Sequence, residues 1–216
     1  MALHYILMAD VVGSHSIDSQ QLQANFKKLV AHCNESIGEQ ILSPFTITLG
    51  DEFQGVAKSL KGVLESIFYL EENGIRRGYD FKLRYIAHYG EIQTKLNRKI
   101  AYEMLGPGLT FARGMLSDKR RDRPRFLFML ENDYLSNNLN RLGKILESLT
   151  DRWKVKDFPL ISEMLSNHNN KEVGLKHKKN RSQVWKRRKQ LFIEEYQLLK
   201  SSIFDLEKIN KRDANL

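Results

Sequence analysis

The amino-acid sequence predicts an α+β fold in which an antiparallel sheet, with helices on one face, precedes a small all-helical part. Four apolar runs of strand length and two amphipathic stretches follow one another as strand, helix, strand, strand, helix, strand. The charge then changes abruptly, because residues 169–190 carry nine lysines and arginines against the single acid Glu172. That segment therefore holds a net charge of +8, out of +9 for the whole chain.

Length and composition bound the organisation of the chain. Its 216 residues can form one large domain, or a domain of about 150 residues with a small appendage. The charge asymmetry favours the second, and we predict three parts, residues 1–150, 151–190 and 191–216. The sequence shows no apolar run of about 18 residues and no secretory leader, and its single cysteine, Cys33, cannot form an internal disulfide. We expect a cytoplasmic protein with no membrane partner.

The first predicted elements are strands at 4–12, 45–49 and 52–57 and a helix at 19–37. The strand at 4–12 is an apolar run that closes at Gly13 and Ser14, after which Ser19 can cap the helix. Apolar residues recur three and four positions apart through that helix. Gly50 and Asp51 lie between the second and third strands, where they predict a tight hairpin turn.

The elements that follow are helices at 59–72, 109–119 and 135–149 and strands at 81–89 and 125–130. An apolar face defines the helix at 59–72, and Asn73 with Gly74 is expected to end it. The strand at 81–89 alternates, with Phe81, Leu83 and Tyr85 on one face. The order of the first six elements is the split βαβ arrangement of a ferredoxin-like sheet, with both helices on one face.

Two carboxylates, Asp10 and Asp51, each end an apolar run beside a glycine. In the predicted sheet both lie on its open face, within a few ångströms of each other. Two unpaired carboxylates that close favour either a shared proton or a divalent cation, and in the second case Mg²⁺ or Mn²⁺ is the expected cofactor. Glu52 and Gln54 share a strand face and are further candidates for the same ligand. The alternative is structural: Asp10 caps the first helix, and the Gly50–Asp51 pair is only a turn.

Three segments, residues 9–14, 50–52 and 83–91, resemble in order the blocks of the class III nucleotidyl cyclase and diguanylate cyclase palm. The resemblance implies that Asp10 and Asp51 hold metal ions on a nucleoside triphosphate, and that Gly13 lets backbone N–H groups approach its phosphates. Ser14 and Glu52 are further candidates for nucleotide or phosphate binding. Residues 10–14, 48–55 and 106–113 resemble the SatD family more closely, over about residues 3–190. That resemblance implies no particular activity.

Three departures from the cyclase pattern argue against cyclisation. Ile47 stands where active cyclases have a base-selecting lysine, and Thr110 and Gly114 stand where they have an asparagine and an arginine. Arg113 is one residue out of register and is expected to point elsewhere, since one helical residue turns a side chain by about 100°. It remains a candidate phosphate ligand through bidentate contact. Losing a group that stabilises developing charge typically costs about a hundredfold in rate or more, so we expect a degenerate palm.

Two other candidates near the palm have alternative interpretations without a functional role. His88 lies beside Gly90 and is more often a packed core histidine than a ligand. The basic cluster at residues 119–125 is interpreted either as a phosphate-facing rim or as a solvated loop.

The basic segment resembles a helix-turn-helix. Apolar spacing predicts a helix at 158–168, Asn169 and Asn170 can cap a second at 171–177, and a third opens at Arg181. Gly174 and Val184, ten positions apart, match the residues that pack the two helices of that motif. The resemblance implies DNA contacts through Arg181, Ser182, Gln183, Lys186, Arg187 and Lys189. His177 and Lys179 weaken the two-helix core, and the alternative is a basic helix that binds polyanions without reading sequence.

An apolar stripe follows the basic segment. Its residues alternate four and three positions apart, as in a two-heptad seam: Phe192, Tyr196, Leu199, Ile203 and Leu206. The stripe either joins two chains into a homodimer or docks on its own chain.

The sequence thus predicts a DNA-binding regulatory protein with a cyclase-like, catalytically degenerate domain that binds a nucleotide or a metal. One alternative is a metal-dependent enzyme acting on nucleotides, of cyclase or phosphohydrolase type, that is tethered to nucleic acid. Another is a DNA-binding module whose palm serves only as a scaffold. The missing lysine, asparagine and arginine equivalents weigh against the enzyme.

Overall fold

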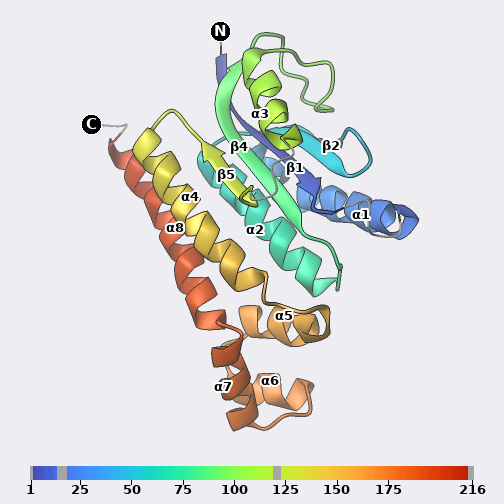
Figure 1. Ribbon diagram of the computed structural model, residues 1–216, viewed down its shortest axis with the longest axis vertical. Coiled ribbons are helices and arrows are strands. Elements are labelled where there is room, and N and C mark those ends of the chain that lie inside the picture. Colours follow the sequence, from blue (N-terminus) through green and yellow to red (C-terminus); the bar gives the residue numbers. More distant parts are fainter. Residues whose placement is uncertain (1, 14–18, 119–122, 214–216) are drawn as a thin grey trace.

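A computed structural model describes the backbone of residues 2–13, 19–118 and 123–213 (Figure 1). Its single sheet contains the strands β1 (Ala2–Val11), β2 (Ile41–Ile47), β3 (Glu52–Ala57), β4 (Leu83–Ile92) and β5 (Phe126–Met129). The strand order is β2-β3-β1-β4-β5. The first four strands pair antiparallel, whereas β5 pairs parallel with β4. The antiparallel arrangement predicted for the first four strands is therefore confirmed, and β5, whose direction was not predicted, makes the sheet mixed.

Eight α-helices accompany the sheet within the described residues: α1 (Ser19–Ile37), α2 (Leu60–Arg76), α3 (Pro107–Ser117), α4 (Asp133–Thr150), α5 (Phe158–Ser166), α6 (Asn170–Lys176), α7 (Arg181–Gln190) and α8 (Ile193–Asp213). Two short 3₁₀ turns, η2 (Gly38–Gln40) and η3 (Val155–Asp157), complete the described elements. The α+β class and the order of the first six main elements, from β1 to β4, are confirmed. None of the described helices is both long and apolar enough to cross a membrane.

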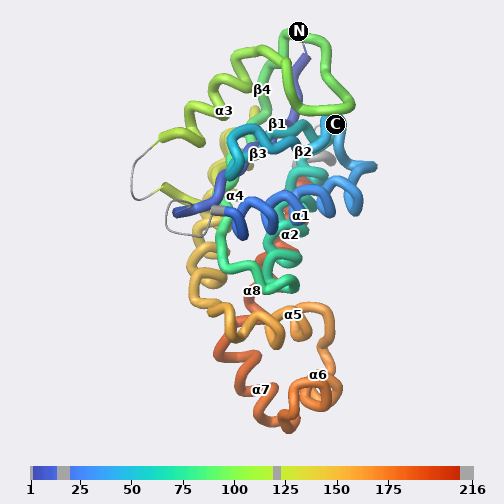
Figure 2. The backbone as a smooth tube through the Cα atoms, turned by 90° about the vertical axis from the view of Figure 1, so that its right-hand side faces the viewer, coloured from blue at the N-terminus to red at the C-terminus, as the bar shows by residue number. Residues whose placement is uncertain are grey.

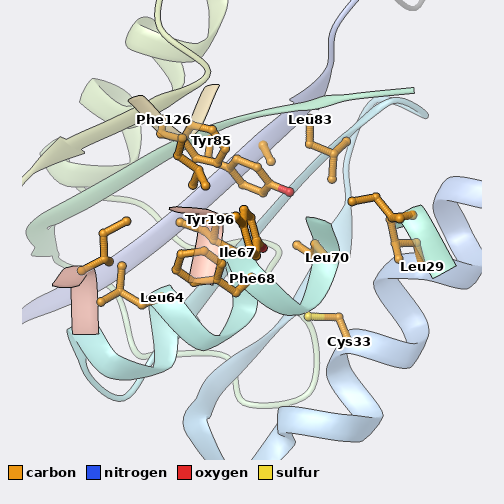
Figure 3. Close-up of a cluster of buried hydrophobic side chains, with 14 of the residues drawn as sticks. Leu29, Cys33, Leu64, Ile67, Phe68, Leu70, Leu83, Tyr85, Phe126 and Tyr196 are labelled. Atoms are coloured by element: carbon orange, nitrogen blue, oxygen red, sulfur yellow. The ribbon is translucent and has the colours of Figure 1, made fainter. Parts of the chain in front are cut away.

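Alternation along β1 divides the interior into two cores. Leu7, Ala9 and Val11 belong to the larger core, which also includes α1, α2, α4 and α8. Figure 3 shows part of it, where Tyr85 and Phe126 of the sheet lie over Ile67 of α2. Ile6 and Met8 point to the opposite face and pack with residues of α3 in a smaller core. The face predicted to be open is therefore partly covered by α3.

The second helix ends later than predicted. It continues through Asn73 and Gly74 because the end of the helix is fixed at Gly78, whose φ is +71°. The N–H of Tyr79 donates to the carbonyl of Gly74, and that of Gly78 donates to the carbonyl of Ile75, both at 3.0 Å. These two bonds form a Schellman motif, which needs a left-handed residue that glycine supplies without strain.

The second strand begins earlier than predicted, at Ile41 instead of Phe45. Pro44 lies inside it, in a stretch where the pairing with β3 shifts register between Ser43 and Thr46. β2 is at the edge of the sheet, where proline removes no ladder hydrogen bond from a second neighbour. The edge position of β2 thus explains why the strand continues through Pro44, although the sequence predicted that it begins only after this residue.

The C-terminal helices form an elongated lower part (Figures 1 and 2). α6 and α7 lie at the end of the molecule away from the sheet, and α8 returns alongside α4. The apolar stripe of α8 docks on its own chain, because Tyr196, Leu199 and Ile203 are buried in the larger core. The Tyr196 hydroxyl donates to Glu72 of α2 at 3.0 Å. The alternative of a homodimer through Phe192, Tyr196, Leu199, Ile203 and Leu206 is therefore contradicted for the buried members of that set.

Candidate functional site

Asp10 lies near the end of β1 on the face that α3 partly covers. Strand register places it opposite Glu52 of β3 on one side and Arg84 of β4 on the other. The Arg84 Nη1 donates to Asp10 Oδ2 at 3.1 Å, in an ion pair whose side chains are both largely buried. Asp10 therefore follows Ile6 and Met8 in the row of side chains on this face.

Asp51 is held beside Asp10 by its backbone. It ends the loop between β2 and β3, in which Gly50 has a φ of +83° and the Thr48 N–H donates to the Glu52 carbonyl at 2.9 Å. The Val11 N–H donates to the Asp51 carbonyl, also at 2.9 Å. The hairpin turn predicted at Gly50 and Asp51 thus brings the second aspartate next to the end of β1.

The carboxyl group of Asp10 is electrostatically unusual. Burial raises its pKa, and the charges of Asp51 and Glu52 add to that rise, while Arg84 and Arg123 oppose it. Its Oδ1 atom is buried and has no hydrogen-bond partner among the described residues. Buried polar atoms are rarely left unpaired, so this oxygen marks a place where a ligand atom would be accommodated.

Arg113 of α3 reaches the same face of the sheet. Its Nη1 lies 2.8 Å from Glu52 Oε1, and its Nη2 donates to Gln54 Oε1 at 2.9 Å. The expectation that Arg113 points elsewhere was wrong. Its neighbour Ala112 faces the sheet and is fully buried, and the long, flexible arginine side chain spans the remaining offset from the edge of the helix.

Glycines set how closely α3 approaches β4. A Cβ on Gly106 would lie 2.5 Å from the carbonyl oxygen of Glu91, and one on Gly108 would lie 2.7 Å from the carbonyl carbon of Gly90. The Gly106-Pro107-Gly108 sequence is therefore a packing requirement that positions the helix over the sheet. Thr110 is exposed and bonds only to the carbonyl of Gly106 among the described residues.

Sequence reasoning missed Arg84, and it considered Arg123 only as a member of the basic cluster at 119–125. Arg123 donates to the carbonyls of Met115 and Leu116 at 3.0 and 2.7 Å, and so holds the end of α3. The predicted alternation of β4 had already placed Leu83 and Tyr85 toward the helices. Arg84 lies between Leu83 and Tyr85, so its side chain must point to the opposite face of the sheet, where Asp10 lies. The alternation of β4 could therefore have identified Arg84 from the sequence.

The basic cluster at 119–125 divides into parts. Residues 119–122 lie outside the described residues. Arg125 is 5% exposed, and its Nη2 lies 2.7 Å from both carboxylate oxygens of Glu71. Its Nη1 donates to Asp151 at 3.1 Å, and Tyr85 donates to the same Glu71 at 2.9 Å. Both interpretations of this cluster, rim and solvated loop, were wrong for Arg125, which is a buried structural group.

The remaining candidates near the palm are placed as follows. Gly13 is exposed just beyond β1 with a φ of +69°, and Ser14 lies outside the described residues. The Nδ1 of His88 lies 2.9 Å from the Met129 carbonyl oxygen, and its ring packs on Phe111, as expected of a packed histidine. Within the described ranges, no group of three or more histidine, cysteine, aspartate or glutamate side chains is arranged to hold a metal ion.

We call residues 151–190 the tail. Within it, Asn169 caps α6 and Asn180 forms a capping box with Gln183 at the start of α7. A Cβ on Gly174 would lie 2.4 Å from the Lys179 carbonyl oxygen and 3.5 Å from Val184 Cγ2. Gly174 and Val184 thus meet where α6 and α7 pack, at the positions that the sequence singled out.

The predicted DNA-contacting residues of α7 differ in their surroundings. Arg181, Ser182, Lys186 and Lys189 are exposed, and Lys189 pairs with Glu194. The side chain of Gln183 accepts from the backbone of Asn180, and Arg187 pairs with Asp157 at 2.6 Å.

Arg188, in contrast, is buried. It is 3% exposed and donates to Asn170 Oδ1 and to the carbonyls of Met164 and Asn167, at 3.0, 2.9 and 2.7 Å. Its hydrogen bonds join α7 to α5 and α6. They compensate for the apolar contacts that are missing where His177 and Lys179 replace aliphatic residues. This explains how the tail packs despite the weak apolar core that its sequence indicates.

Comparison with known proteins agrees with the resemblance seen in the sequence. A model of the SatD family matches residues 4–207, which include both the sheet and the tail. No curated protein matches the chain. Because the family match covers nearly the whole sequence, from β1 into α8, the chain belongs to the SatD family.

Proposed function

We propose that this protein is a DNA-binding regulatory protein, in which a nucleotide bound with Mg²⁺ or Mn²⁺ beside Asp10 biases how the tail engages DNA. The ferredoxin-like order of the first four strands and the paired α6 and α7 agree with a cyclase-like palm followed by a helix-turn-helix. The two parts have separate supporting observations, and each has its own test.

The observation that carries DNA binding is a set of unpaired cations on the tail. Within residues 169–190 of the tail, five lysines and arginines are exposed and form no side-chain ion pair among the described residues: Lys171, Lys178, Lys179, Arg181 and Lys186. They belong to α6, the turn after it and α7, and these two helices lie at the end of the molecule away from the sheet (Figure 1). Such a concentration of one sign of charge favours a polyanionic partner, of which nucleic acid is the commonest.

Support for a nucleotide comes from the carboxylates on the α3 side of the sheet. Asp10 offers a buried oxygen without a hydrogen-bond partner among the described residues, and Asp51 is anchored beside it. Mg²⁺ is usually held by one or two carboxylates, with phosphates and waters as its other ligands, so a closed three-ligand cluster is not required. The residues present fit a metal–nucleotide, whose metal would neutralise phosphate charge. Gly13, with its positive φ, would allow close approach of phosphates.

A metal-dependent enzyme acting on nucleotides is the second candidate. It is favoured by Arg113, whose guanidinium is oriented by Glu52 and Gln54 on the same face as Asp10. Guanidinium has five N–H donors, so contacts to phosphate remain available. Cyclisation itself is disfavoured by Ile47, Thr110 and Gly114, which cannot select a base or neutralise the reacting phosphate.

DNA binding is tested by fluorescence anisotropy of the full chain with duplex DNA of random sequence, measured over a range of NaCl concentrations. The Lys179→Ala/Lys186→Ala variant should bind about tenfold more weakly. Each lysine that contacts a phosphate releases a counterion from the DNA, and the variant loses that favourable contribution at two positions. The matched control is Lys95→Ala/Lys99→Ala, which removes the same charge from exposed positions in the segment between β4 and α3. Absence of DNA binding by the unmodified protein would contradict the proposal.

Nucleotide binding is tested by calorimetric titration with ATP, GTP, CTP and UTP, each with Mg²⁺ or Mn²⁺, with product analysis by mass spectrometry. Binding that requires the metal and is lost in Asp51→Ala, without product, supports the regulatory role. Product formation would instead support the enzyme. If none of the nucleotides binds, the sheet domain is a scaffold and DNA binding is the function that remains.

A further inference from the structure

Two adjoining hollows lie along one side of the tail. One lies between residues 152–157 and the end of α7, with a volume of about 270 Å³, and the other lies between η3, the start of α5 and α7, with a volume of about 430 Å³. Both are lined by the same four residues at their junction: Lys156, Asp157, Arg187 and Gln190. The two hollows adjoin at these four residues, and we call the pair the tail groove.

The tail groove is strongly basic. Its cationic lining residues are Arg152, Lys154, Lys156, Lys179, Lys186 and Arg187. The single acidic residue in the lining is Asp157, whose Oδ1 pairs with Arg187 Nη2 at 2.6 Å. Three of the six cations precede α5 and lie outside the basic segment that the sequence singled out. The fold therefore extends the cationic surface beyond residues 169–190.

The walls of the groove are fixed by buried contacts. The indole N–H of Trp153, which is 5% exposed, donates to the carbonyl of Leu191 at 2.8 Å. The Asp157–Arg187 pair joins η3 to α7. These contacts hold Lys154 and Lys156 opposite α7. Both lysines are exposed and form no ion pair with any other described residue. A pre-formed groove loses little conformational entropy when it binds a ligand.

The groove also divides α7 into two surfaces. Gln183, Lys186 and Arg187 line it, whereas Arg181, Ser182 and Lys189 do not. This division follows from the turn of about 100° per helical residue, which places positions 183, 186, 187 and 190 on one side. The α7 residues that the sequence singled out for DNA contact therefore belong to two surfaces.

We propose that the tail groove binds the phosphodiester backbone of DNA, with Lys154, Lys156 and Lys186 contacting phosphates of one strand. This rests on the proposed DNA binding of the tail and identifies where the backbone lies. Cations distributed over two adjoining hollows match a chain of phosphates, whereas a single nucleotide would occupy only one of the two hollows. Backbone contacts of this kind position a protein on the duplex and carry no sequence information.

The test uses the full chain with Lys154→Ala/Lys156→Ala, compared with the Lys95→Ala/Lys99→Ala control. Anisotropy with random-sequence duplex DNA should show affinity reduced about tenfold at low salt. It should also show a log–log salt slope smaller by about 2, since each lost phosphate contact contributes about 0.9. The control should bind as the unmodified protein does. Thermal melting should be unchanged in both variants, because all four lysines are exposed. Lys154→Gln/Lys156→Gln is a second variant, which has the same charge as the double alanine variant but keeps longer, polar side chains.

The outcomes separate the two proposals. If the unmodified protein does not bind DNA, the proposed function fails and the groove loses its ligand. If it binds DNA and Lys154→Ala/Lys156→Ala binds equally well with the same salt slope, the groove proposal alone is overturned. Inorganic phosphate, added at constant ionic strength, should not displace DNA at phosphate concentrations comparable with that of the DNA. Displacement would show that the groove takes single phosphate groups, and would also overturn the proposal.

Discussion

The α3 face of the sheet and the tail both concentrate charge, but they differ in how that charge is compensated. On the sheet face, Arg84 pairs with Asp10 and Arg113 pairs with Glu52, so opposite charges meet within one layer. Around the tail groove, lysines such as Lys154 and Lys186 have no acidic partner among the described residues. The first arrangement suits a small charged ligand held among balanced groups, and the second suits a polyanion.

Both basic clusters in the sequence nevertheless contain an arginine that is buried in the fold. Arg125 ends the cluster at 119–125, and Arg188 lies within the run 186–189, yet both are buried and hydrogen-bonded. Counting cations in the sequence does not separate these structural groups from their exposed neighbours. Substitutions that distinguish the two kinds are therefore the most direct test of the comparison.

The largest effect is expected from Arg125→Ala. This change leaves Glu71 buried without its cation, and loss of one partner of a buried pair costs about 3–5 kcal/mol. The free energy of unfolding, measured by chemical denaturation, should fall by that amount. Lys179→Ala in the tail should change it by less than about 0.5 kcal/mol. Similar losses in the two variants would contradict the distinction between paired and unpaired cations.

A smaller loss is expected from Arg188→Ala. The carbonyls of Met164 and Asn167 lose their donors, which costs roughly 2–3 kcal/mol for buried acceptors. Lys189→Ala is the adjacent control and should have little effect, since Lys189 is exposed and surface ion pairs contribute little. Denaturation curves for the two variants should differ clearly. Equal stability would mean that Arg188 does not hold the tail together.

Two glycines should respond in opposite directions. In Gly174→Ala the new methyl would lie 2.4 Å from the Lys179 carbonyl oxygen, so the turn after α6 must shift, at a cost of about 1–3 kcal/mol. Gly114→Ala lies in α3 with nothing within 4 Å of the new carbon, and should stabilise by about 0.5–1 kcal/mol. Thermal melting should show a fall for the first and a rise for the second. A rise for Gly174→Ala would refute close packing of α6 on the turn.

The smallest effect concerns the pH dependence of Asp10. Its pKa is raised in the folded state, mainly by burial, so ionisation of Asp10 destabilises the fold above that pKa. As the pH falls through the folded pKa, the carboxyl is protonated and this destabilisation disappears. Asp10→Asn should therefore be more stable than the unmodified protein at pH 7, by roughly 1 kcal/mol or less, and the difference should shrink toward pH 4.

Asp133→Asn, which removes one carboxylate from an exposed position, is the control for this measurement. Denaturant unfolding of all three proteins between pH 4 and 8 provides the comparison. A stability difference for Asp10→Asn that stays constant over this range would mean that Arg84 fully offsets the burial of Asp10.

The sequence by itself determined the α+β class, the order of the main elements and the cap at Asn169. It also placed Asp10 and Asp51 at neighbouring strand ends, and Glu52 and Gln54 on one face. These features depend on periodicity, caps and turns, which involve residues only a few positions apart. Physical rules for local structure are therefore sufficient to predict them.

Only the tertiary structure decided which partners the long cationic side chains and the apolar stripe on α8 contact. Hydrogen bonds join Arg125 to Glu71, Arg113 to Gln54, and Tyr196 to Glu72. The bonded residues are 54, 59 and 124 positions apart in the sequence. The tail groove likewise joins residues 152–156 with α7. A side chain that can reach in several directions is fixed by whichever partner the packing brings near, and local sequence carries no information about that partner.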